Sequence, residues 1–363
     1  MAKKKLRVAM IGTGFIARVH SNAFRQVGHF FSSPFELEQA MLCGRDRANT
    51  QSAASAWGWT EIATDWRTVV DRKDIDVIDI AVPNKLHAPI VMAAASARKI
   101  ILCEKPLATS LSEAEQMAQA VRNVANLVWF NYRRIPAVVL AKQIVEHGRL
   151  GERFHFRALY LNQSANDPKK TGTWRYKKDQ AGSGAAGDLL SHLLDFALYL
   201  NGPLNEVNAM MHTFVEGRDV DDATMLLAKF ANGSIGTFEA TRYGVGFRNR
   251  NGFEMNGSKG WLGFNFEDMN FLEFYDATDE APVRGSKRIM VTGPEHPYSE
   301  NFWKPGHPIG YEHTFIATLG DFLSALAGGE TFHPNFGDAL QVQRLLDAIE
   351  RSSESRSWIT LAA

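Results

Sequence analysis

Short apolar runs alternate with longer amphipathic segments over roughly the first third of the chain. The runs expected to form buried strands are rich in β-branched residues and lie at residues 6–11, 37–43, 77–81, 100–103 and 127–130. Segments with helical periodicity lie between them, at residues 16–27, 47–57, 87–96 and 112–122, and Ser112 is the expected cap of the last. This alternation predicts a doubly wound parallel sheet, a Rossmann-type α/β domain over residues 1–130.

The pattern changes after a helix predicted at residues 137–147, which Gly148 ends. Strand-like segments then follow one another, at residues 154–161, 206–213, 224–230, 234–242, 253–256, 261–266 and 271–275. Few helices separate these strands, which predicts a mainly antiparallel sheet. We therefore expect a second α/β domain over residues 131–363, with an irregular excursion at 281–310 and closing helices at 311–327 and 338–350.

Length and charge agree with two domains and a small ligand. A chain of 363 residues exceeds what one hydrophobic core usually organises. Its 40 basic and 40 acidic side chains balance, which gives no electrostatic reason to expect nucleic acid or a charged membrane surface as a partner. No run approaches the roughly 18 apolar residues of a membrane span, and the basic start leads into a short strand rather than a secretory core. We expect a cytoplasmic protein that acts on a small molecule.

Cysteine and histidine positions argue against a metal centre. Cys43 and Cys103 are the only cysteines, and each closes an apolar run, which predicts buried packing rather than a disulfide or a thiolate site. The 11 histidines show no H-E-x-x-H or comparable ligand spacing. We expect no metal.

A glycine-rich turn follows the first predicted strand and opens the first predicted helix. Gly12 permits the tight turn, Gly14 lets the backbone approach a pyrophosphate, and Ala17 allows close packing of helix on strand. The free N–H groups at the helix start, at Phe15 and Ile16, attract phosphate oxygens. This segment predicts a dinucleotide-binding site.

The end of the second predicted strand bears on the choice of cofactor. The acidic residue that normally accepts the ribose hydroxyls is missing, because Gly44 stands there, followed by Arg45 and Asp46. Arg45 suits a ribose 2′-phosphate or the adenine face, whereas Asp46 suits the hydroxyls. The sequence leaves NAD and NADP open, with a slight preference for NADP.

Two further segments follow predicted strands. Val82, Pro83, Asn84 and His87 come after one strand, and Glu104 and Lys105 come after the next. Ligands of doubly wound sheets bind at these carboxyl ends, so we expect these residues around the nicotinamide half of the cofactor. A lysine buried there can have its pKa lowered and take part in proton transfer.

These motifs together resemble the Gfo/Idh/MocA family of oxidoreductases. The resemblance rests on residues 12–17, the Pro83-Asn84-x-x-His87 and Glu104-Lys105-Pro106 motifs, residues 131–133, and a glycine-rich segment, 182–187, followed by Asp188 and His192. It implies NAD(P)-dependent oxidation of a sugar, inositol or related polyol, with Asn131 on the cofactor side. It also implies a cis bond before Pro106 and a second domain that binds substrate and assembles through its open sheet into homodimers or homotetramers.

The resemblance further implies that Lys105 and His192 handle the proton, while Asp188 and Asp195 orient or tune them. On a helix predicted over residues 188–200, Asp188, His192 and Asp195 share one face. The ordinary pKa of histidine suits a base that takes a hydroxyl proton while the hydride departs. Trp174, Arg175 and Gln163 are further substrate-binding candidates, Trp174 because aromatic rings stack on sugar faces.

Several alternatives stay open. Inositols, free aldoses, anhydrosugars and glycosides all fit as substrates. A glycosidase acting by transient oxidation fits the same fold, although no export signal is seen, and a non-catalytic dinucleotide-binding regulator fits less well because Lys105 and His192 are both present. Ser183 and Ala185 interrupt the glycine-rich segment, and the connection at residues 28–36 contacts either substrate or a partner subunit.

Overall fold

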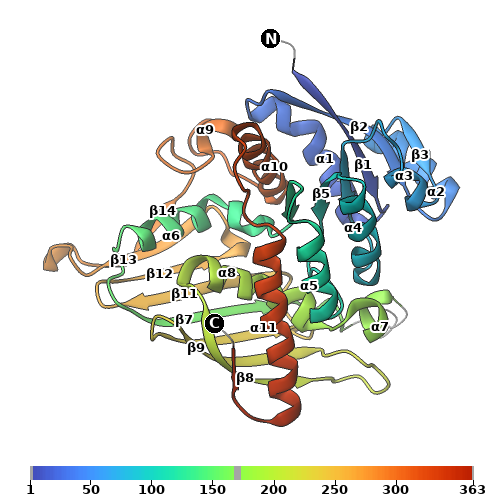
Figure 1. Ribbon diagram of the computed structural model, residues 1–363. Helices are drawn as coiled ribbons and strands as arrows, with labels where there is room; N and C mark the ends of the chain where they lie inside the picture. Colours follow the sequence, from blue (N-terminus) through green and yellow to red (C-terminus); the bar gives the residue numbers. More distant parts are fainter. Residues whose placement is uncertain (1–2, 167–172, 362–363) are drawn as a thin grey trace. The chain divides into compact units, whose positions relative to one another are not determined.

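The computed structural model describes residues 3–166 and 173–361. The chain divides into two compact units (Figure 1). The first unit comprises Met1–Asn131 and Gly310–Gln341, and the second comprises Tyr132–Ile309 and Val342–Ala363. No helix in the described ranges is long and apolar enough to cross a membrane.

The first unit is built on a parallel sheet with the strand order β3-β2-β1-β4-β5-β6. Its strands are β1 (Lys4–Ile11), β2 (Phe35–Cys43), β3 (Glu61–Ala63), β4 (Val77–Ile80), β5 (Ile100–Cys103) and β6 (Asn126–Val128). β4 is buried along its whole length, as expected for a parallel strand covered on both faces. The order reverses between β1 and β4, which is where doubly wound sheets bind ligands. The predicted Rossmann fold is confirmed.

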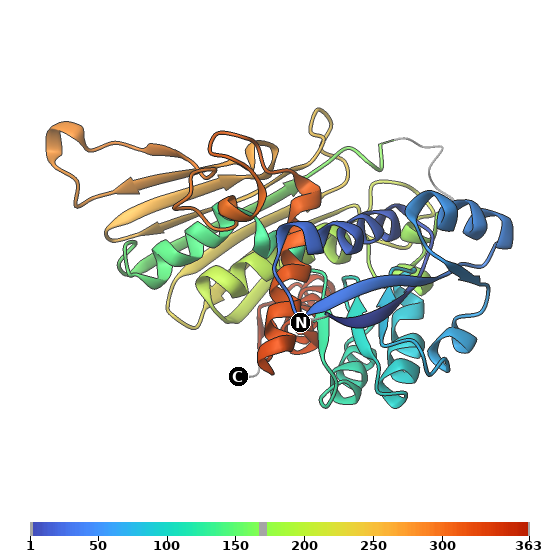
Figure 2. The same cartoon turned by 90° about the horizontal axis from the view of Figure 1, so that it is seen from above.

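Helices flank this sheet on both faces (Figure 2). They are α1 (Phe15–Phe30), α2 (Arg47–Trp57), α3 (Trp66–Val70), α4 (His87–Ser96), α5 (Leu111–Ala120) and α10 (Tyr311–Gly328). The prediction of Ser112 as the cap of α5 is wrong. Ser110 has the extended backbone of a cap, and its hydroxyl accepts a hydrogen bond from the N–H of Glu113 at 3.3 Å.

Residues 310–341, which the sequence pattern placed in the second domain, belong to the first unit. Helix α10 packs along α1, and Gly320 of α10 faces the ring of Phe31 so closely that any Cβ there would collide with it. Phe315 of the same helix packs against the Trp129 ring with centroids 5.5 Å apart. These contacts join residues that are far apart along the chain, 289 positions for Gly320 and Phe31 and 186 for Phe315 and Trp129, which explains why local periodicity did not reveal them.

The second unit is built on a sheet with the strand order β14-β13-β12-β11-β7-β10-β9-β8-β15. Its strands are β7 (Arg153–Leu161), β8 (Leu204–His212), β9 (Ala223–Phe230), β10 (Ile235–Thr241), β11 (Arg250–Gly257), β12 (Gly260–Asn265), β13 (Phe271–Asp276), β14 (Lys287–Met290) and β15 (Ile359–Thr360). β7 and β10 pair in parallel and the other neighbours pair antiparallel, so the predicted mainly antiparallel sheet is confirmed. The stretch predicted to be irregular at 281–310 contains β14 and the short helix α9 (Ser299–Phe302).

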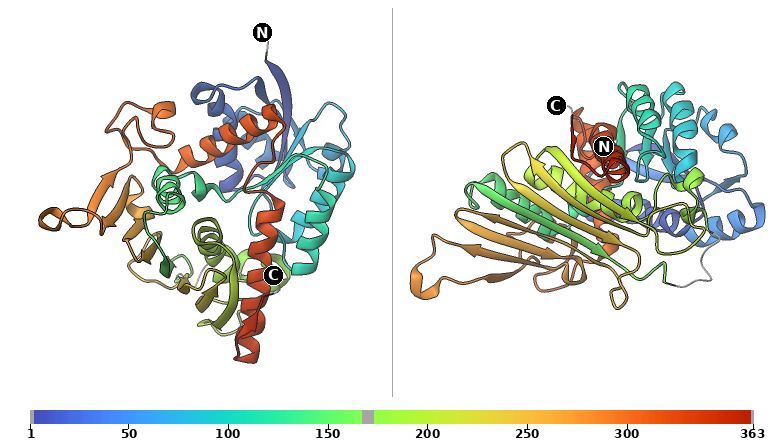
Figure 3. Two further views of the ribbon diagram at one scale, coloured as in Figure 1. Left: turned by 60° about the vertical axis from the view of Figure 1, so that its left-hand side comes forward. Right: turned by 90° about the horizontal axis from the view of Figure 1, so that it is seen from below.

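Helices cover one face of this sheet and leave the other open (Figure 3). The helices of this unit are α6 (Pro136–Glu146), α7 (Lys178–Ala181), α8 (Ser191–Asn201) and the C-terminal part of α11 (Phe336–Ser355). Phe196 of α8 meets Phe253 and Phe264 of the sheet with ring centroids 5.2 and 6.3 Å apart. Buried and exposed residues alternate along β9, where Met225 and Leu227 point to the open face and are 48% and 50% exposed.

Candidate active site

The loop after β1 has the shape that a dinucleotide phosphate site requires. Gly12 has φ +132°, and its N–H donates to the carbonyl of Cys43 at 2.9 Å. A Cβ at Gly12 would collide with the carbonyl oxygen of Ala81, so only glycine fits where the ends of β1, β2 and β4 meet. A Cβ at Gly14, in contrast, would meet nothing within 4 Å, which leaves open space at the start of α1.

The start of α1 supplies the expected donors. Gly14 is the N-cap of the helix and makes no side-chain cap hydrogen bond. The N–H groups of Phe15 and Ile16 follow it in the first turn, where an anion is favoured by the helix dipole. Ala17 is fully buried against the sheet, as the fingerprint requires. The residues present therefore fit a dinucleotide pyrophosphate.

Close packing explains the missing acid after β2. A Cβ at Gly44 would lie 2.5 Å from both Thr13 Cγ2 and Thr50 Oγ1, so a carboxylate side chain does not fit at this position. Asp46 is the N-cap of α2, where its Oδ1 accepts from the N–H of Asn49 at 2.7 Å. Arg45 lies between them and is exposed.

His87 contacts the loops that follow β4 and β5 at their carboxyl ends. Its side chain is fully buried, with Nε2 3.0 Å from the carbonyl oxygen of Val82 and Nδ1 3.2 Å from those of Pro106 and Leu107. Burial lowers the pKa of this imidazole, although the carbonyls act against that effect. These contacts hold the His87 ring among backbone carbonyls, and its expected place near the nicotinamide stays a prediction. Pro83 caps a 3-10 turn that begins at the buried Asn84.

Glu104 and Lys105 follow β5 directly. The N–H of Glu104 donates to the carbonyl of Ile80 at 3.0 Å, and Oε2 of Glu104 accepts from the backbone N–H of Lys105 at 3.1 Å. The Lys105–Pro106 bond is cis, as the resemblance implied. Glu104 thus holds the main chain of Lys105 at the end of the strand.

The buried contacts of His20 with Asp79 and Glu104 were not predicted. His20 of α1 is fully buried, with Nδ1 2.8 Å from Asp79 Oδ2 and Nε2 3.1 Å from Glu104 Oε1. Burial acts to lower the pKa of His20, but the Asp79 charge and the two carboxylate contacts outweigh burial and raise it to about 9. The signal that could have revealed this group is Asp79, a charged residue inside an apolar strand, because an unpaired buried carboxylate is rare.

Asn131 also takes part in internal contacts of the first unit. Its side chain is buried, and Nδ2 donates to the hydroxyl of Thr314 in α10 at 2.7 Å.

Cys43 and Cys103 are buried free thiols, as predicted. The described residues contain no group of three or more His, Cys, Asp or Glu side chains placed to hold a metal ion.

In the second unit, the glycine-rich segment is held by Asp221. One carboxylate oxygen of Asp221 accepts from the N–H of Gly184 at 2.6 Å, and the other accepts from the N–H of Ala186 at 2.7 Å and the hydroxyl of Thr224 at 3.0 Å. A Cβ at Gly184 would collide with the carbonyl of Asp221. Asp221 is a second residue that sequence reasoning missed.

The segment that carries Asp188 and His192 begins differently from the predicted α-helix. Residues Ala186–Leu190 form a π-helical turn, and α8 begins at Ser191. A π-helical turn is wider than an α-helical one and often occurs at functional sites. His192 is 7% exposed and stacks on Tyr132, with ring centroids 4.4 Å apart and planes inclined by 29°.

Both acids expected to tune His192 are paired with arginines. Asp188 Oδ2 accepts from Arg242 Nη2 at 3.0 Å. Asp195 accepts from Arg133 Nε at 3.0 Å and from its Nη2 at 2.6 Å, a buried fork contact of the guanidinium–carboxylate type. The arginine partners were not predicted, because they lie far from the acids in sequence.

The further substrate-binding candidates, Trp174, Arg175 and Gln163, lie in the same unit. Trp174 opens a 3-10 turn, and the Arg175 guanidinium lies 4.6 Å from its ring centroid. Gln163 Oε1 accepts from the N–H of Gly246 at 3.1 Å. On the sheet of this unit, Asn251 is paired in register with Tyr160, and its carboxamide is fully buried without a hydrogen-bond partner among the described residues.

Comparison with known proteins agrees with this fold and these motifs. Residues 6–132 match the oxidoreductase family with an NAD-binding Rossmann fold, and residues 138–263 match the GFO/IDH/MocA C-terminal domain. The levoglucosan dehydrogenase of Pseudarthrobacter phenanthrenivorans is 39% identical over 98% of both chains.

Solved structures show the same likeness over the whole chain. An oxidoreductase domain protein from Kribbella flavida is 43% identical, with a TM-score of 0.96 and full coverage of both chains. A levoglucosan dehydrogenase in complex with NADH and levoglucosan is 40% identical, with a TM-score of 0.96 over 99% of this chain and 100% of the other. The chain therefore belongs to the Gfo/Idh/MocA family of oxidoreductases.

Proposed function

We propose that this protein is an NAD-dependent dehydrogenase that oxidises a secondary hydroxyl of a sugar, with an anhydrosugar such as levoglucosan as the first candidate substrate. The full-length likeness to levoglucosan dehydrogenase carries this proposal, since 98% of each chain is covered at 39% identity. Inositols, free aldoses and glycosides are the other substrates to test.

The first unit holds the cofactor in this proposal. Gly12, Gly14 and the N–H groups of Phe15 and Ile16 bind the pyrophosphate, because the open space at Gly14 lies at the positive end of α1. Gly44 and Arg45 lie on the adenosine side, and Val82, Pro83, Asn84, Glu104, Lys105 and Asn131 on the nicotinamide side. When bound, the nicotinamide supplies the hydride acceptor. We favour NAD over the NADP suggested by Arg45, because the matching family is described as NAD-binding and a 40% identical structure contains NADH.

Proton transfer is assigned to Lys105 and His192. Lys105 donates a hydrogen bond to the hydroxyl oxygen, and His192 takes the hydroxyl proton as the C–H hydride leaves. The stack on Tyr132 fixes the plane of the His192 ring, and Asp188, held by Arg242, lies in the turn that precedes His192. Trp174, Arg175 and Gln163 bind the sugar in this proposal, together with Asn251, whose buried carboxamide needs a partner.

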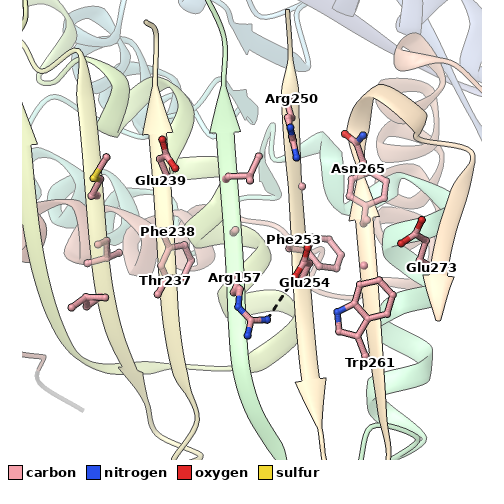
Figure 4. A pocket seen from close by; sticks show the side chains of 18 of the residues that line it. Arg157, Thr237, Phe238, Glu239, Arg250, Phe253, Glu254, Trp261, Asn265 and Glu273 are labelled. Carbon is pink, nitrogen blue, oxygen red and sulfur yellow. Dashed lines mark ion pairs between the residues drawn. The ribbon is translucent and has the colours of Figure 1, made fainter. Parts of the chain in front are cut away.

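A second copy of the chain is the partner we propose. The open face of the sheet carries Met210, Met225, Leu227 and Ile235, each about half exposed or more. The first three help to line a hollow that is otherwise lined largely by charged and aromatic side chains (Figure 4). Within it, Arg157 and Glu254 form an ion pair at 3.6 Å. Exposed apolar side chains among charged ones on one sheet face suit a homodimer or homotetramer.

The test is absorbance of the reduced nicotinamide while anhydrosugars, aldoses, inositols and glycosides are offered with NAD and NADP separately. We expect a substrate-dependent rise with NAD and an anhydrosugar. A protein that binds NADH but gives no rise with any pair would contradict the dehydrogenase proposal and favour a glycosidase or a regulator.

The matched variant is His192→Ala. Loss of a general base costs about 10²- to 10⁴-fold in kcat. The affinity for NADH, measured by its fluorescence, should stay unchanged, because the phosphate loop belongs to the other unit. Unchanged turnover would remove His192 from the mechanism.

A further inference from the structure

The strongest feature outside the motifs is the buried chain of ionisable groups formed by Asp79, His20 and Glu104. Asp79 lies in β4, His20 in α1 and Glu104 directly after β5, so the chain links three elements around the nucleotide-binding end of the sheet. His20 and Asp79 are fully buried. Two carboxylates in such a place require compensation, because an unpaired buried charge costs several kcal/mol.

The contacts of the ring fix its protonation state. Each ring nitrogen faces a carboxylate oxygen, at 2.8 Å for Asp79 and 3.1 Å for Glu104. A neutral imidazole has one N–H and one lone pair, so it satisfies only one of these contacts as a donor. An imidazolium satisfies both, and each contact then becomes a charge-assisted hydrogen bond.

The surroundings hold the ring in this position. His20 stacks on Trp129, with centroids 4.1 Å apart and planes at 28°, and the indole N–H of Trp129 donates to the second oxygen of Asp79 at 3.0 Å. Phe315 of α10 closes another side, with its centroid 5.4 Å away. The other titratable groups beside these three are Cys103, whose thiol pKa is raised by burial and then by the two carboxylates, and His87, whose pKa is lowered by burial against the opposing effect of the Glu104 charge.

This chain of ionisable groups ends at the backbone of Lys105. Oε1 of Glu104 meets His20, while Oε2 accepts from the N–H of Lys105 at 3.1 Å. We propose that His20 is a positioning residue: as a buried imidazolium it fixes the Glu104 carboxylate, which in turn fixes the backbone of Lys105. This inference rests on the role that the proposed function gives to Lys105.

The first test does not depend on activity. With nitrogen-15 in the histidine rings, NMR at about pH 8 should show both ring nitrogens of His20 protonated, whereas an ordinary histidine is neutral there. The signal is assigned by its loss in His20→Gln. Absence of any doubly protonated histidine at this pH would overturn the proposal, and this result needs no variant.

The second test compares two variants of His20, each of which keeps one of its two carboxylate contacts. The amide nitrogen of asparagine replaces the Nδ1 position and keeps the contact to Asp79, whereas that of glutamine replaces Nε2 and keeps the contact to Glu104. If His20 acts through Glu104, His20→Gln should retain about tenfold more kcat than His20→Asn, since a misplacement of about 1 Å costs about 10²-fold and a smaller one costs less. NADH affinity should be alike in both.

A merely structural role of His20 would reverse the ranking of the two variants. If His20 only anchors α1 to β4, His20→Asn should be the better variant in kcat and in its unfolding midpoint, and equal losses in both would also overturn the proposal. Should neither variant fold, Glu104→Gln takes their place: kcat should fall and one ring nitrogen of His20 should lose its proton, and an unchanged kcat would contradict the role.

Lys105→Met separates this proposal from the proposed function. If Lys105→Met retains the wild-type kcat, the role of Lys105 in the proposed function fails, whatever the His20 variants do. If Lys105→Met abolishes turnover while the two His20 variants lose activity equally, the positioning role of His20 alone fails.

Discussion

Gly12 is the residue whose replacement has the clearest structural consequence. Its φ of +132° is strained for any other residue, and a Cβ would collide with the carbonyl of Ala81. Gly12→Val should therefore reduce NADH affinity by at least about tenfold and lower the unfolding midpoint, since two strand ends must move apart. Gly14→Ala is the control for stability alone: a Cβ there would meet nothing within 4 Å, so the unfolding midpoint should stay unchanged, whereas its NADH affinity should fall because Gly14 is assigned to the pyrophosphate. A Gly12→Val protein with wild-type NADH affinity would refute the phosphate-loop assignment.

Asn251 offers a prediction in which stability and binding change in opposite directions. Its carboxamide is fully buried and unpartnered among the described residues, which costs about 1–3 kcal/mol in the sugar-free protein. Asn251→Leu, of similar volume, should raise the urea midpoint. If the carboxamide binds a sugar hydroxyl, the same variant should raise KM about tenfold.

Kinetics and urea unfolding of Asn251→Leu, side by side, check this pair of expectations. A higher midpoint with an unchanged KM would remove Asn251 from the substrate-binding set. Gln163→Leu serves as the comparison for stability only: its amide oxygen already accepts from the N–H of Gly246, so its urea midpoint should not rise.

At the scale of elements, the glycine-rich segment before α8 depends on Asp221. This carboxylate accepts from two backbone N–H groups and from Thr224. Asp221→Asn should destabilise the protein by about 1–3 kcal/mol, because the amide NH₂ meets an N–H donor and leaves both unsatisfied. Turnover should fall as well, since the π-helical turn that carries Asp188 starts at Ala186.

Thr224→Val is the milder control for that prediction. It removes one hydroxyl donor at 3.0 Å and leaves both backbone contacts of Asp221 in place. Urea unfolding and kcat should both change less than in Asp221→Asn. Equal effects of the two substitutions would show that the hydroxyl, rather than the backbone contacts, holds the segment.

Elements with strong local signals were predictable from sequence. The helices over residues 47–57 and 87–96 and the strand over 100–103 coincide with α2, α4 and β5. Those missed are short: β3 and α3 have 3 and 5 residues, too few for a periodic pattern. The π-helical turn at Ala186–Leu190 arises where Asp221 holds the preceding loop, and no local periodicity encodes that contact.

The same limit applies to the candidate site. Lys105 and His192 stand in motifs and were found, and their roles remain predictions. His20, Asp221 and the arginine partners of Asp188 and Asp195 gain meaning only through residues 35 to 84 positions away. His87 lies in a motif, yet its ring is held by backbone carbonyls, which residue types do not reveal.

At the scale of the whole molecule, the buried imidazolium links stability to pH. The pKa of His20 is raised to about 9 in the folded protein, against an ordinary value of about 6.5 when unfolded. A raised pKa contributes stability that is fully present below the unfolded value and is lost as the pH rises through the folded value. The free energy of unfolding should therefore decline between about pH 6.5 and 9, by an amount on the order of 3 kcal/mol from this group.

Urea unfolding of wild type and His20→Gln across this range measures that linkage. The difference between the two proteins isolates His20 from other groups that titrate there. We expect the advantage of wild type to shrink as the pH rises. A difference that stays constant from pH 6 to 10 would show that His20 does not change its protonation on folding.

The open sheet face gives the prediction about assembly. Leu227 lies near the middle of β9, points to the open face and is 50% exposed. In an isologous interface the same patch meets itself, so one substitution places two charges at the contact. Leu227→Arg should convert the assembly to a monomer of 40.4 kDa, as measured by light scattering after size exclusion.

The control for assembly is Met92→Arg on α4, an equally apolar residue that is 39% exposed outside this sheet. It should leave the mass of the assembly unchanged. If wild type is already a monomer, or if Leu227→Arg keeps the wild-type mass, the sheet face does not join copies of the chain. Because the apolar residues on this face alternate with buried ones along β9, its exposure follows from the strand pattern itself. β9 lies between β10 and β8, so its backbone is already paired on both sides. Its exposed face therefore offers a partner side-chain packing rather than the addition of a strand.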